Sequence, residues 1–313
     1  MKVLALAGGV GGAKLALGLC RLLAPRNLTV VVNTGDDEVF HGLQVCPDLD
    51  TVTYTLAGLV NTETGWGLAG DTFNALGMLE QYGADTWFRI GDKDLATHIE
   101  RTRLLKQGRT LSQVTRQLCV RLGVKASVVP MSDQPVRTRV KTDQGEMAFQ
   151  EYFVQRQCQP RIRGVRFQGA KKAEAAPGFR QALDKAEVAI FCPSNPMVSI
   201  APILSVKGAR PGLRSFRGPR IAVSPIVGGQ ALKGPAAKMF QELGEEVSCV
   251  GVARRLASVC DVMVIDSVDA HQAQGVRAAG LEPVVLNTIM NTDADKERLA
   301  FEVLEVARER LKR

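Results

Sequence analysis

The chain has 313 residues, of which 45% are hydrophobic and 23% are charged, and its net charge is +8. This length allows one large α/β domain, or such a domain with a smaller one inserted. No apolar run reaches the roughly 18 residues of a membrane helix, and glycines end the first run early, so we expect a cytoplasmic protein. The positive charge favours an anionic small substrate over nucleic acid, because the basic segments carry few interleaved aromatic residues.

The first stretch predicts a strand, a glycine-rich turn and a helix. Val3–Ala7 is an apolar run typical of a buried parallel strand, and a helix is expected over Ala13–Leu23. The turn between them contains four glycines, among them Gly9, Gly11 and Gly12. Such a turn presents free backbone N–H groups to an anion, and Lys14 adds a positive charge. We interpret it as a phosphate or nucleotide loop, although it completes neither the Walker pattern nor the dinucleotide fingerprint.

A second apolar run, Leu28–Asn33, leads into a group of carboxylates. A parallel strand there would place them at the sheet edge where open α/β sheets bind ligands. Four acids lie within 15 residues, namely Asp36, Asp37, Asp48 and Asp50. Such hard oxygen ligands suit magnesium better than zinc, and we take Asp36 and Asp48 as the metal ligands. An acid after the second strand that binds a ribose is the alternative.

The middle of the chain predicts helices and a change to antiparallel strands. A helix is expected over Thr51–Leu59, with Asp50 or Thr51 as its N-cap. Arg89 lies in a short aromatic strand that starts at Trp87, and it could pair with an acid or an anion. Two further helices are expected over Ala96–Lys106 and Leu111–Leu122. Alternating segments then predict antiparallel strands at Val136–Val140, Glu146–Val154 and Arg161–Phe167.

The parallel pattern returns in the last part of the chain. Apolar runs predict strands at Val188–Phe191, Arg220–Val223, Val262–Asp266 and Pro283–Leu286. Ser194 and Asn195 follow the first of these and are suited to cap a helix or to hold a phosphate. Gly228 and Gly229 predict a second glycine loop at a strand-to-helix joint. Asp293–Lys312 is expected to be the closing helix.

These elements predict an α/β fold, with a Rossmann-like parallel sheet flanked by helices. The core would comprise residues 1–130 and 171–313 and would bind nucleotide and a flat substrate. Residues 131–170 would form a small antiparallel β insertion.

Several motifs together resemble the 2-phospho-L-lactate transferase family, which acts in biosynthesis of the deazaflavin coenzyme, factor 420. The family also includes bacterial phosphoenolpyruvate transferases. The resemblance follows the family's order over nearly the whole chain. It is carried by GGVGGAKL at 8–15, VVNTGDD at 31–37, CPDLDTVTYTLAG at 46–58, GDKDLATH at 91–98, PSNPMVSIAPIL at 193–204 and SPIVGGQALKGPAAK at 224–238.

The resemblance implies a magnesium-dependent transfer between two small molecules. The hydroxyl of 7,8-didemethyl-8-hydroxy-5-deazariboflavin would attack a guanosine diphosphate diester of a three-carbon acid, and GMP would leave. By family analogy, Asp50 and Arg89 match positions that contact the deazaflavin. Asp48 and Asp50 are then the catalytic candidates, and a homodimer is implied. The expected nucleotide-binding residues are Gly9, Gly11, Gly12, Lys14, Ser194, Asn195, Gly228 and Gly229.

Two other functions stay open at this point. Gluconeogenesis-factor proteins of the same superfamily share the glycine loop and an NTGDD-like element, and they are regulatory. A nicotinamide-dependent oxidoreductase would use the same strand, turn and helix, but Lys14 stands where its third fingerprint glycine belongs. The transferred acid is also open, since phospholactate, phosphoenolpyruvate and phosphoglycerate differ by only a few atoms.

Overall fold

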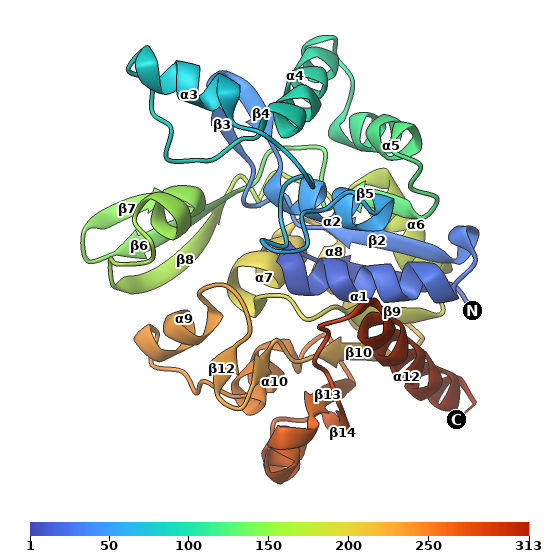
Figure 1. The fold of residues 1–313 in the computed structure, drawn as a ribbon. Helices are drawn as coiled ribbons and strands as arrows, with labels where there is room; N and C mark the ends of the chain where they lie inside the picture. The colour runs from blue at the N-terminus through green and yellow to red at the C-terminus, as the bar shows by residue number, and fades with distance from the viewer. Residues whose placement is uncertain (313) are drawn as a thin grey trace.

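The computed structural model describes residues 1–312 and shows one parallel sheet covered by helices on both faces (Figure 1). Seven strands pair in parallel in the order β14-β13-β10-β9-β1-β2-β5. Their bounds are β1 Val3–Ala7, β2 Leu28–Val32, β5 Ser127–Pro130, β9 Val188–Phe191, β10 Arg220–Val223, β13 Val262–Asp266 and β14 Glu282–Leu286. The predicted α/β class with a Rossmann-like sheet is confirmed.

Strand β1 is buried along its whole length and divides the core into two layers. Leu4 and Leu6 face one hydrophobic cluster, whereas Val3, Ala5 and Ala7 face the other. A strand buried on both faces needs apolar residues at every position, which is why the parallel strands are continuous apolar runs. Helices cover the two layers.

The layer over Val3, Ala5 and Ala7 is formed by the helices α1 Gly9–Leu22, α2 Pro47–Ala57, α5 Leu111–Arg121 and α12 Asp293–Leu311. Helix α12 packs along α1, so the last helix of the chain lies beside the first (Figure 1). The opposite layer contains α6 Pro177–Lys185, α7 Ala201–Ser205, α8 Ala209–Arg214, α9 Ala236–Glu242, α10 Cys249–Leu256 and α11 Ala273–Ala278. Helices α3 Asn74–Gln81 and α4 Asp92–Lys106 extend beyond the sheet edge formed by β5 (Figure 1).

The topology fixes where a ligand would bind. From β1 the chain first builds one side of the sheet, through β2 and β5, and then returns to the other side of β1 with β9. In open α/β sheets, ligands bind beyond the carboxyl ends of the strands at such a reversal. The first turn of α1 and the loop after β9 meet at this point.

The expected antiparallel strands between residues 131 and 170 are present. A three-stranded sheet with the order β7-β6-β8 is formed by β6 Arg137–Thr142, β7 Gly145–Ala148 and β8 Ile162–Gln168. Val140, Met147 and Ile162 enter the same core cluster as Phe179 of α6. The division of the chain into a core and an insertion stays a prediction.

Shorter elements complete the described chain. Two small hairpins are formed by β3 Glu38–Phe40 with β4 Leu43–Val45, and by β11 Ile226–Val227 with β12 Gln230–Ala231. Single turns of other helix types are η1 Pro25–Asn27, η2 Glu151–Gln155, η3 Pro196–Ile200 and η4 Ser267–Gln272. Among residues 1–312, no helix is both long and apolar enough to cross a membrane.

The structure corrects several predicted boundaries. Helix α1 begins at Gly9 rather than Ala13, and α4 begins at Asp92 rather than Ala96. The predicted β-strand from Glu146 to Val154 stops at Ala148, where the chain turns into η2. The aromatic segment 87–90 is not a strand.

Helix α2 also starts earlier than predicted. It begins at Pro47, whose fixed φ suits a first helical position, and its N-cap is Cys46 rather than Asp50 or Thr51. Asp48 and Asp50 therefore lie in its first turn.

The second predicted glycine loop lies between strand β10 and helix α9, as expected, and contains a short hairpin. Gly228 and Gly229 form the turn of this β11–β12 hairpin, with φ values of +57° and +73°. Two consecutive residues with positive φ are typical of a tight hairpin turn.

Candidate active site

Asp48 joins three elements at the carboxyl end of the sheet. Its Oδ1 accepts the backbone N–H of Gly9 at 2.8 Å, and its Oδ2 accepts from Nδ2 of Asn33 at 2.9 Å. Asn33 follows β2, and its own Oδ1 accepts the N–H of Gly35 at 2.8 Å. The carboxylate thus links the starts of α1 and α2 to the end of β2.

Asp36 and Asp48 are two buried carboxylates whose negative charges repel each other. Burial and the charge of Asp48 raise the pKa of Asp36 well above its usual range, and burial raises the pKa of Asp48 to about 6. Oδ1 of Asp36 is buried and accepts no hydrogen bond among the described residues. Two buried carboxylates with free lone pairs are suited to a divalent cation, which would offset their repulsion. Asp36 and Asp48 therefore fit the predicted magnesium ligands.

Asp37 lies beside this pair and is equally buried. Burial raises its pKa to about 7, and its Oδ1 also lacks a hydrogen-bond partner within residues 1–312. Asp37 is thus a third carboxyl group after β2 with an oxygen that is free to accept a hydrogen bond or to bind a cation.

The glycines at the start of α1 accommodate the loop after β9. A Cβ on Gly11 would lie 2.4 Å from the carbonyl oxygen of Pro193, and one on Gly12 would lie 2.6 Å from Oγ of Ser194. The hydroxyl of Ser194 also accepts the N–H of Gly8 at 3.1 Å. Gly9 has a φ of +64°, which a side chain would strain. Part of the glycine pattern is therefore explained by packing rather than by a ligand.

Of the predicted polar pair after β9, only Ser194 contacts the glycine turn. Asn195 caps η3 instead, since its Oδ1 accepts the N–H of Met197 at 2.9 Å. Capping is the role that short polar side chains commonly take at such a joint.

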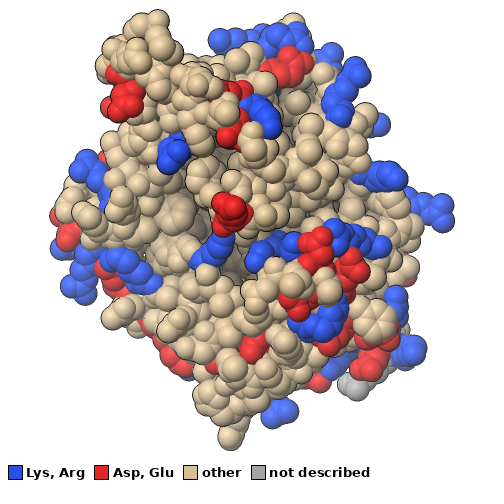
Figure 2. All heavy atoms as spheres, in the orientation of Figure 1, with Lys and Arg blue, Asp and Glu red and all other residues tan. Residues whose placement is uncertain are grey.

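Lysines gather beside the first half of α1. Nζ of Lys14 donates to the carbonyl oxygen of Met290 at 2.7 Å, and its pKa is lowered by burial and by the charges of Lys233 and Lys296. Lys233 donates to the carbonyl oxygen of Thr64 at 2.9 Å. Figure 2 shows a hollow near the centre of the drawn face, with basic side chains on two sides and an acidic side chain above it, where Figure 1 places the start of α1. Clustered positive charge of this kind favours an anionic ligand.

The hairpin glycines contact a neighbouring buried acid. The N–H of Gly228 donates to Oδ2 of the buried Asp269 at 3.0 Å, and a Cβ added at Gly228 or Gly229 would meet Val268 or Val247. The nucleotide role of Gly228 and Gly229 stays a prediction.

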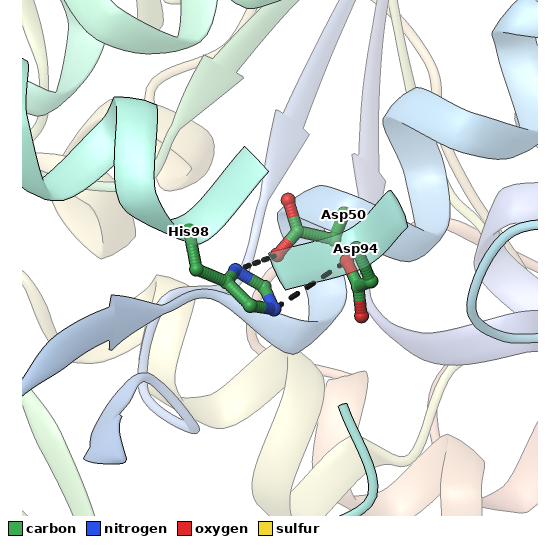
Figure 3. Close-up of side chains that lie close together, drawn as sticks. All are labelled: Asp50, Asp94 and His98. Carbon is green, nitrogen blue, oxygen red and sulfur yellow. Dashed lines mark ion pairs between the residues drawn. The ribbon is translucent and has the colours of Figure 1, made fainter. Parts of the chain in front are cut away.

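Asp50 pairs with side chains of α4, and Figure 3 shows it beside His98 and Asp94. Arg101 of α4 binds both of its oxygens, with Nη1 at 3.1 Å from Oδ2 and Nη2 in contact with Oδ1. His98 lies between Asp50 and Asp94, with Nδ1 at 3.8 Å from Oδ2 of Asp50 and Nε2 at 3.4 Å from Oδ1 of Asp94. The predicted group of four carboxylates is thus divided, with Asp36 and Asp48 on one side and Asp50 on the other.

Arg89 is exposed and stands apart from both groups. Its guanidinium carbon lies 4.4 Å from the centre of the Phe73 ring, in a cation–π contact. No ion pair joins it to Asp50 within residues 1–312, so its predicted contact with the substrate stays a prediction.

Sequence reasoning missed Asn33, Arg101, Asp94 and His98. Asn33 was assigned to the strand, although a polar residue that ends an apolar run was a signal in itself. Asp94 and His98 are four residues apart, a spacing that places them on one helix face. Arg101 carried no local signal, because its partner Asp50 lies 51 positions earlier.

Comparison with known proteins identifies the family of this site. The family model described as 2-phospho-L-lactate transferase CofD matches residues 3–307. The chain belongs to the 2-phospho-L-lactate transferase family. The predicted resemblance is therefore confirmed over nearly the whole length.

Curated members of the 2-phospho-L-lactate transferase family match along their full length. A phosphoenolpyruvate transferase of Kitasatospora aureofaciens is 40% identical over 98% of this chain and 99% of its own. Another, of Streptomyces griseus, is 42% identical over 99% of both chains. A 2-phospho-L-lactate transferase of Methanospirillum hungatei is 40% identical over 96% of this chain and 98% of its own.

Solved structures support the fold alone. A protein of the UPF0052 family from Bacillus halodurans aligns with a TM-score of 0.63 over 97% of this chain and 98% of its own, at 14% identity. The predicted homodimer and cytoplasmic location stay predictions.

Proposed function

We propose that this protein transfers a phospholactate or phosphoenolpyruvate group to the hydroxyl of a deazaflavin alcohol, in biosynthesis of the coenzyme factor 420. The donor would be a guanosine diphosphate diester, and GMP would leave. The names of the curated relatives support this class of reaction. The observation that carries the proposal is the junction at Asp48, where a buried carboxylate pair adjoins the first turn of α1.

Phosphoryl transfer depends mainly on positioning and on neutralisation of charge. We assign the donor phosphates to the first turn of α1, where backbone N–H groups and the helix dipole favour an anion. Lys14 would add positive charge; its pKa is lowered first by burial and then by the nearby Lys233 and Lys296, whose charges would also attract an anion. Ser194 holds the turn through Gly8 and would keep these N–H groups in place.

Magnesium would be held by Asp36 and Asp48. Bound there, the ion would neutralise phosphate charge and polarise the attacked phosphorus. The two carboxylates would serve to keep the cation at the carboxyl end of β2, next to the start of α1. Asp50, together with Arg89, would contact the deazaflavin alcohol, and Asp50 would orient its reacting hydroxyl.

The test is incubation of the protein with the deazaflavin alcohol, magnesium and each guanylylated three-carbon acid, followed by chromatography with fluorescence detection. A more anionic fluorescent product, with GMP released in equal amount, is expected with phospholactate or phosphoenolpyruvate as the transferred group. Product formation without added divalent cation, in the presence of a chelator, would contradict the magnesium assignment. No product with any donor would refute the transferase proposal.

A further inference from the structure

We propose that Arg101 is a positioning residue that fixes the Asp50 carboxylate in the orientation needed for contact with the hydroxyl substrate. This inference rests on the proposed function. Arg101 itself would touch no substrate, because its side chain is only 3% exposed. Its effect on the reaction would pass through Asp50 alone.

The ion pair between Arg101 and Asp50 is buried and bidentate. Both terminal nitrogens of the guanidinium face the two carboxylate oxygens, a geometry that fixes the plane of the carboxylate as well as its position. Nη1 also donates to the carbonyl oxygen of Gln44 at 3.3 Å. Burial acts to lower the pKa of Arg101, but the charge and hydrogen bonding of Asp50, together with the nearby Cys46 and Tyr54, raise it overall. The guanidinium therefore stays charged in this site.

His98 and Asp94 complete the network on the other side of Arg101. Nη1 of Arg101 also lies 3.1 Å from Nδ1 of His98, a contact in which arginine can only donate. Nε2 of His98 faces Oδ1 of Asp94 at 3.4 Å and has no hydrogen-bond partner among the described residues. Asp94 accepts from the hydroxyl of Tyr54 at 2.7 Å. The series of contacts from Tyr54 through Asp94, His98 and Arg101 to Asp50 therefore connects α2 to α4 at two points.

This arrangement also argues against a metal ion in the same place. Ligand atoms of Asp50, Asp94 and His98 lie within 4.8 Å of one another, a spacing that could hold a cation. However, the Arg101 guanidinium already pairs with both oxygens of Asp50 and contacts His98. The cluster already contains its own cation.

Fixing Asp50 has a chemical purpose in the proposed reaction. The side chain is 9% exposed, so little of the carboxylate is open to a ligand and its orientation decides which lone pairs a ligand can reach. Removing one partner of a buried ion pair leaves the other charge without compensation, and the carboxylate would then move or become protonated. A misplacement of about 1 Å can cost about 100-fold in rate, because the reacting groups must be aligned.

The experiment compares Arg101→Met and Arg101→Lys with Arg103→Met, a matched control on the same helix whose side chain is 51% exposed and pairs with Glu100. Steady-state kinetics would be measured separately for the deazaflavin alcohol and for the guanylylated donor. Thermal unfolding would report the stability of each variant.

We expect Arg101→Met to lower kcat/KM for the deazaflavin alcohol about 10- to 100-fold while KM for the donor stays within about twofold. Arg103→Met should leave all parameters within about twofold of the wild type, since exposed ion pairs contribute little. The inference would be overturned if Arg101→Met changed KM equally for the deazaflavin alcohol and the donor, or changed no kinetic parameter.

Arg101→Lys keeps the test valid if the methionine variant fails to fold. Lysine restores the positive charge but cannot form the bidentate pair. Arg101→Lys should therefore be more thermally stable than Arg101→Met, while its kcat/KM for the deazaflavin alcohol stays low. A lysine variant with wild-type kinetics would show that charge alone is needed and would overturn the inference. Failure of wild-type transfer refutes the proposed function, whereas wild-type transfer with unaffected variants refutes only the role of Arg101.

Discussion

The Oδ1 atom of Asp48 accepts the backbone N–H of Gly9 at 2.8 Å, so the first turns of α2 and α1 meet at a single carboxylate. Both helix ends are positive, and they stabilise the negative charge of Asp48. An incoming phosphate would approach the same helix end as this carboxylate. The phosphate and the Asp48 carboxylate would repel each other, and a divalent cation bound between them would offset that repulsion.

Asp36→Asn should stabilise the protein without metal and abolish its response to magnesium. Burial and the nearby charge of Asp48 raise the pKa of Asp36, so its ionised form is unfavourable in the folded state at pH 8. Replacing it with a neutral amide should raise the free energy of unfolding by about 1 kcal/mol or more. Thermal unfolding at pH 8, with and without magnesium chloride, measures both effects.

The matched control for this change is Asp184→Asn, at an exposed acid on α6. It should change neither the midpoint of unfolding nor the response to magnesium, since surface substitutions of this kind have small effects. A magnesium response that survives in Asp36→Asn would contradict the metal assignment.

The pH dependence of stability should run in opposite directions with and without magnesium. Asp48 has a folded-state pKa of about 6, compared with about 3.9 in an unfolded chain. A raised pKa means that the folded state binds the proton more tightly, so this contribution is present below about pH 4 and is lost as pH rises through 6. Its size is about 3 kcal/mol, from a difference of about two pKa units.

Magnesium binding needs the ionised carboxylates, so the stabilisation by magnesium should grow between pH 5 and pH 7.5. Thermal unfolding at several pH values, with and without the ion, separates the two trends. In Asp48→Asn, the loss of stability between about pH 4 and 6 should be reduced relative to the wild type. A magnesium effect that is constant with pH would count against Asp36 and Asp48 as ligands.

The sequence was sufficient for the sheet but not for the site. Strands β1, β9 and β10 were predicted with the observed bounds, because strands buried on both faces are uninterrupted apolar runs. Asp48 and Asp50 were grouped because they are two positions apart. Residues at that spacing in a helix point to different sides, and the separation follows only once α2 is known to begin at Pro47.

The remaining site contacts depend on tertiary structure. Asp50 meets Arg101 only because α4 packs against β4 and brings Arg101 beside the start of α2, and no local pattern predicts a partner 51 residues away. Gly228 and Gly229 have the composition of a phosphate loop, but their φ values show a hairpin turn. Glycine permits both conformations, so its presence alone does not distinguish them.

Gly11→Ala should destabilise the protein, and guanosine nucleotide binding should weaken together with stability. A Cβ at this position would lie 2.4 Å from the backbone carbonyl oxygen of Pro193, so the backbone of α1 or of the loop after β9 would have to shift. Overpacking of this kind typically costs about 1 to 3 kcal/mol. Chemical denaturation measures the loss in the free energy of unfolding.

Gly77→Ala is the matched control, since Gly77 lies inside α3 and a Cβ there would meet nothing within 4 Å. This change should stabilise the protein by about 0.5 to 1 kcal/mol, because alanine loses less backbone entropy than glycine in a helix. If Gly11→Ala were as stable as the wild type, the close packing of α1 on the loop after β9 would be wrong.

Asp71→Ala should loosen the start of α4 and, with it, the network around Asp50. The Asp71 carboxylate accepts the backbone N–H groups of Lys93 at 2.7 Å and Asp94 at 3.1 Å, so it caps α4 from a distant loop. Losing such a cap costs about 1 kcal/mol, and the amide protons of Lys93 and Asp94 should then exchange faster with solvent. Hydrogen exchange followed by mass spectrometry measures this over the first turn of α4. Asp71→Asn keeps an oxygen acceptor and should lose less protection than alanine, whereas unchanged exchange in Asp71→Ala would show that the cap does not hold the helix.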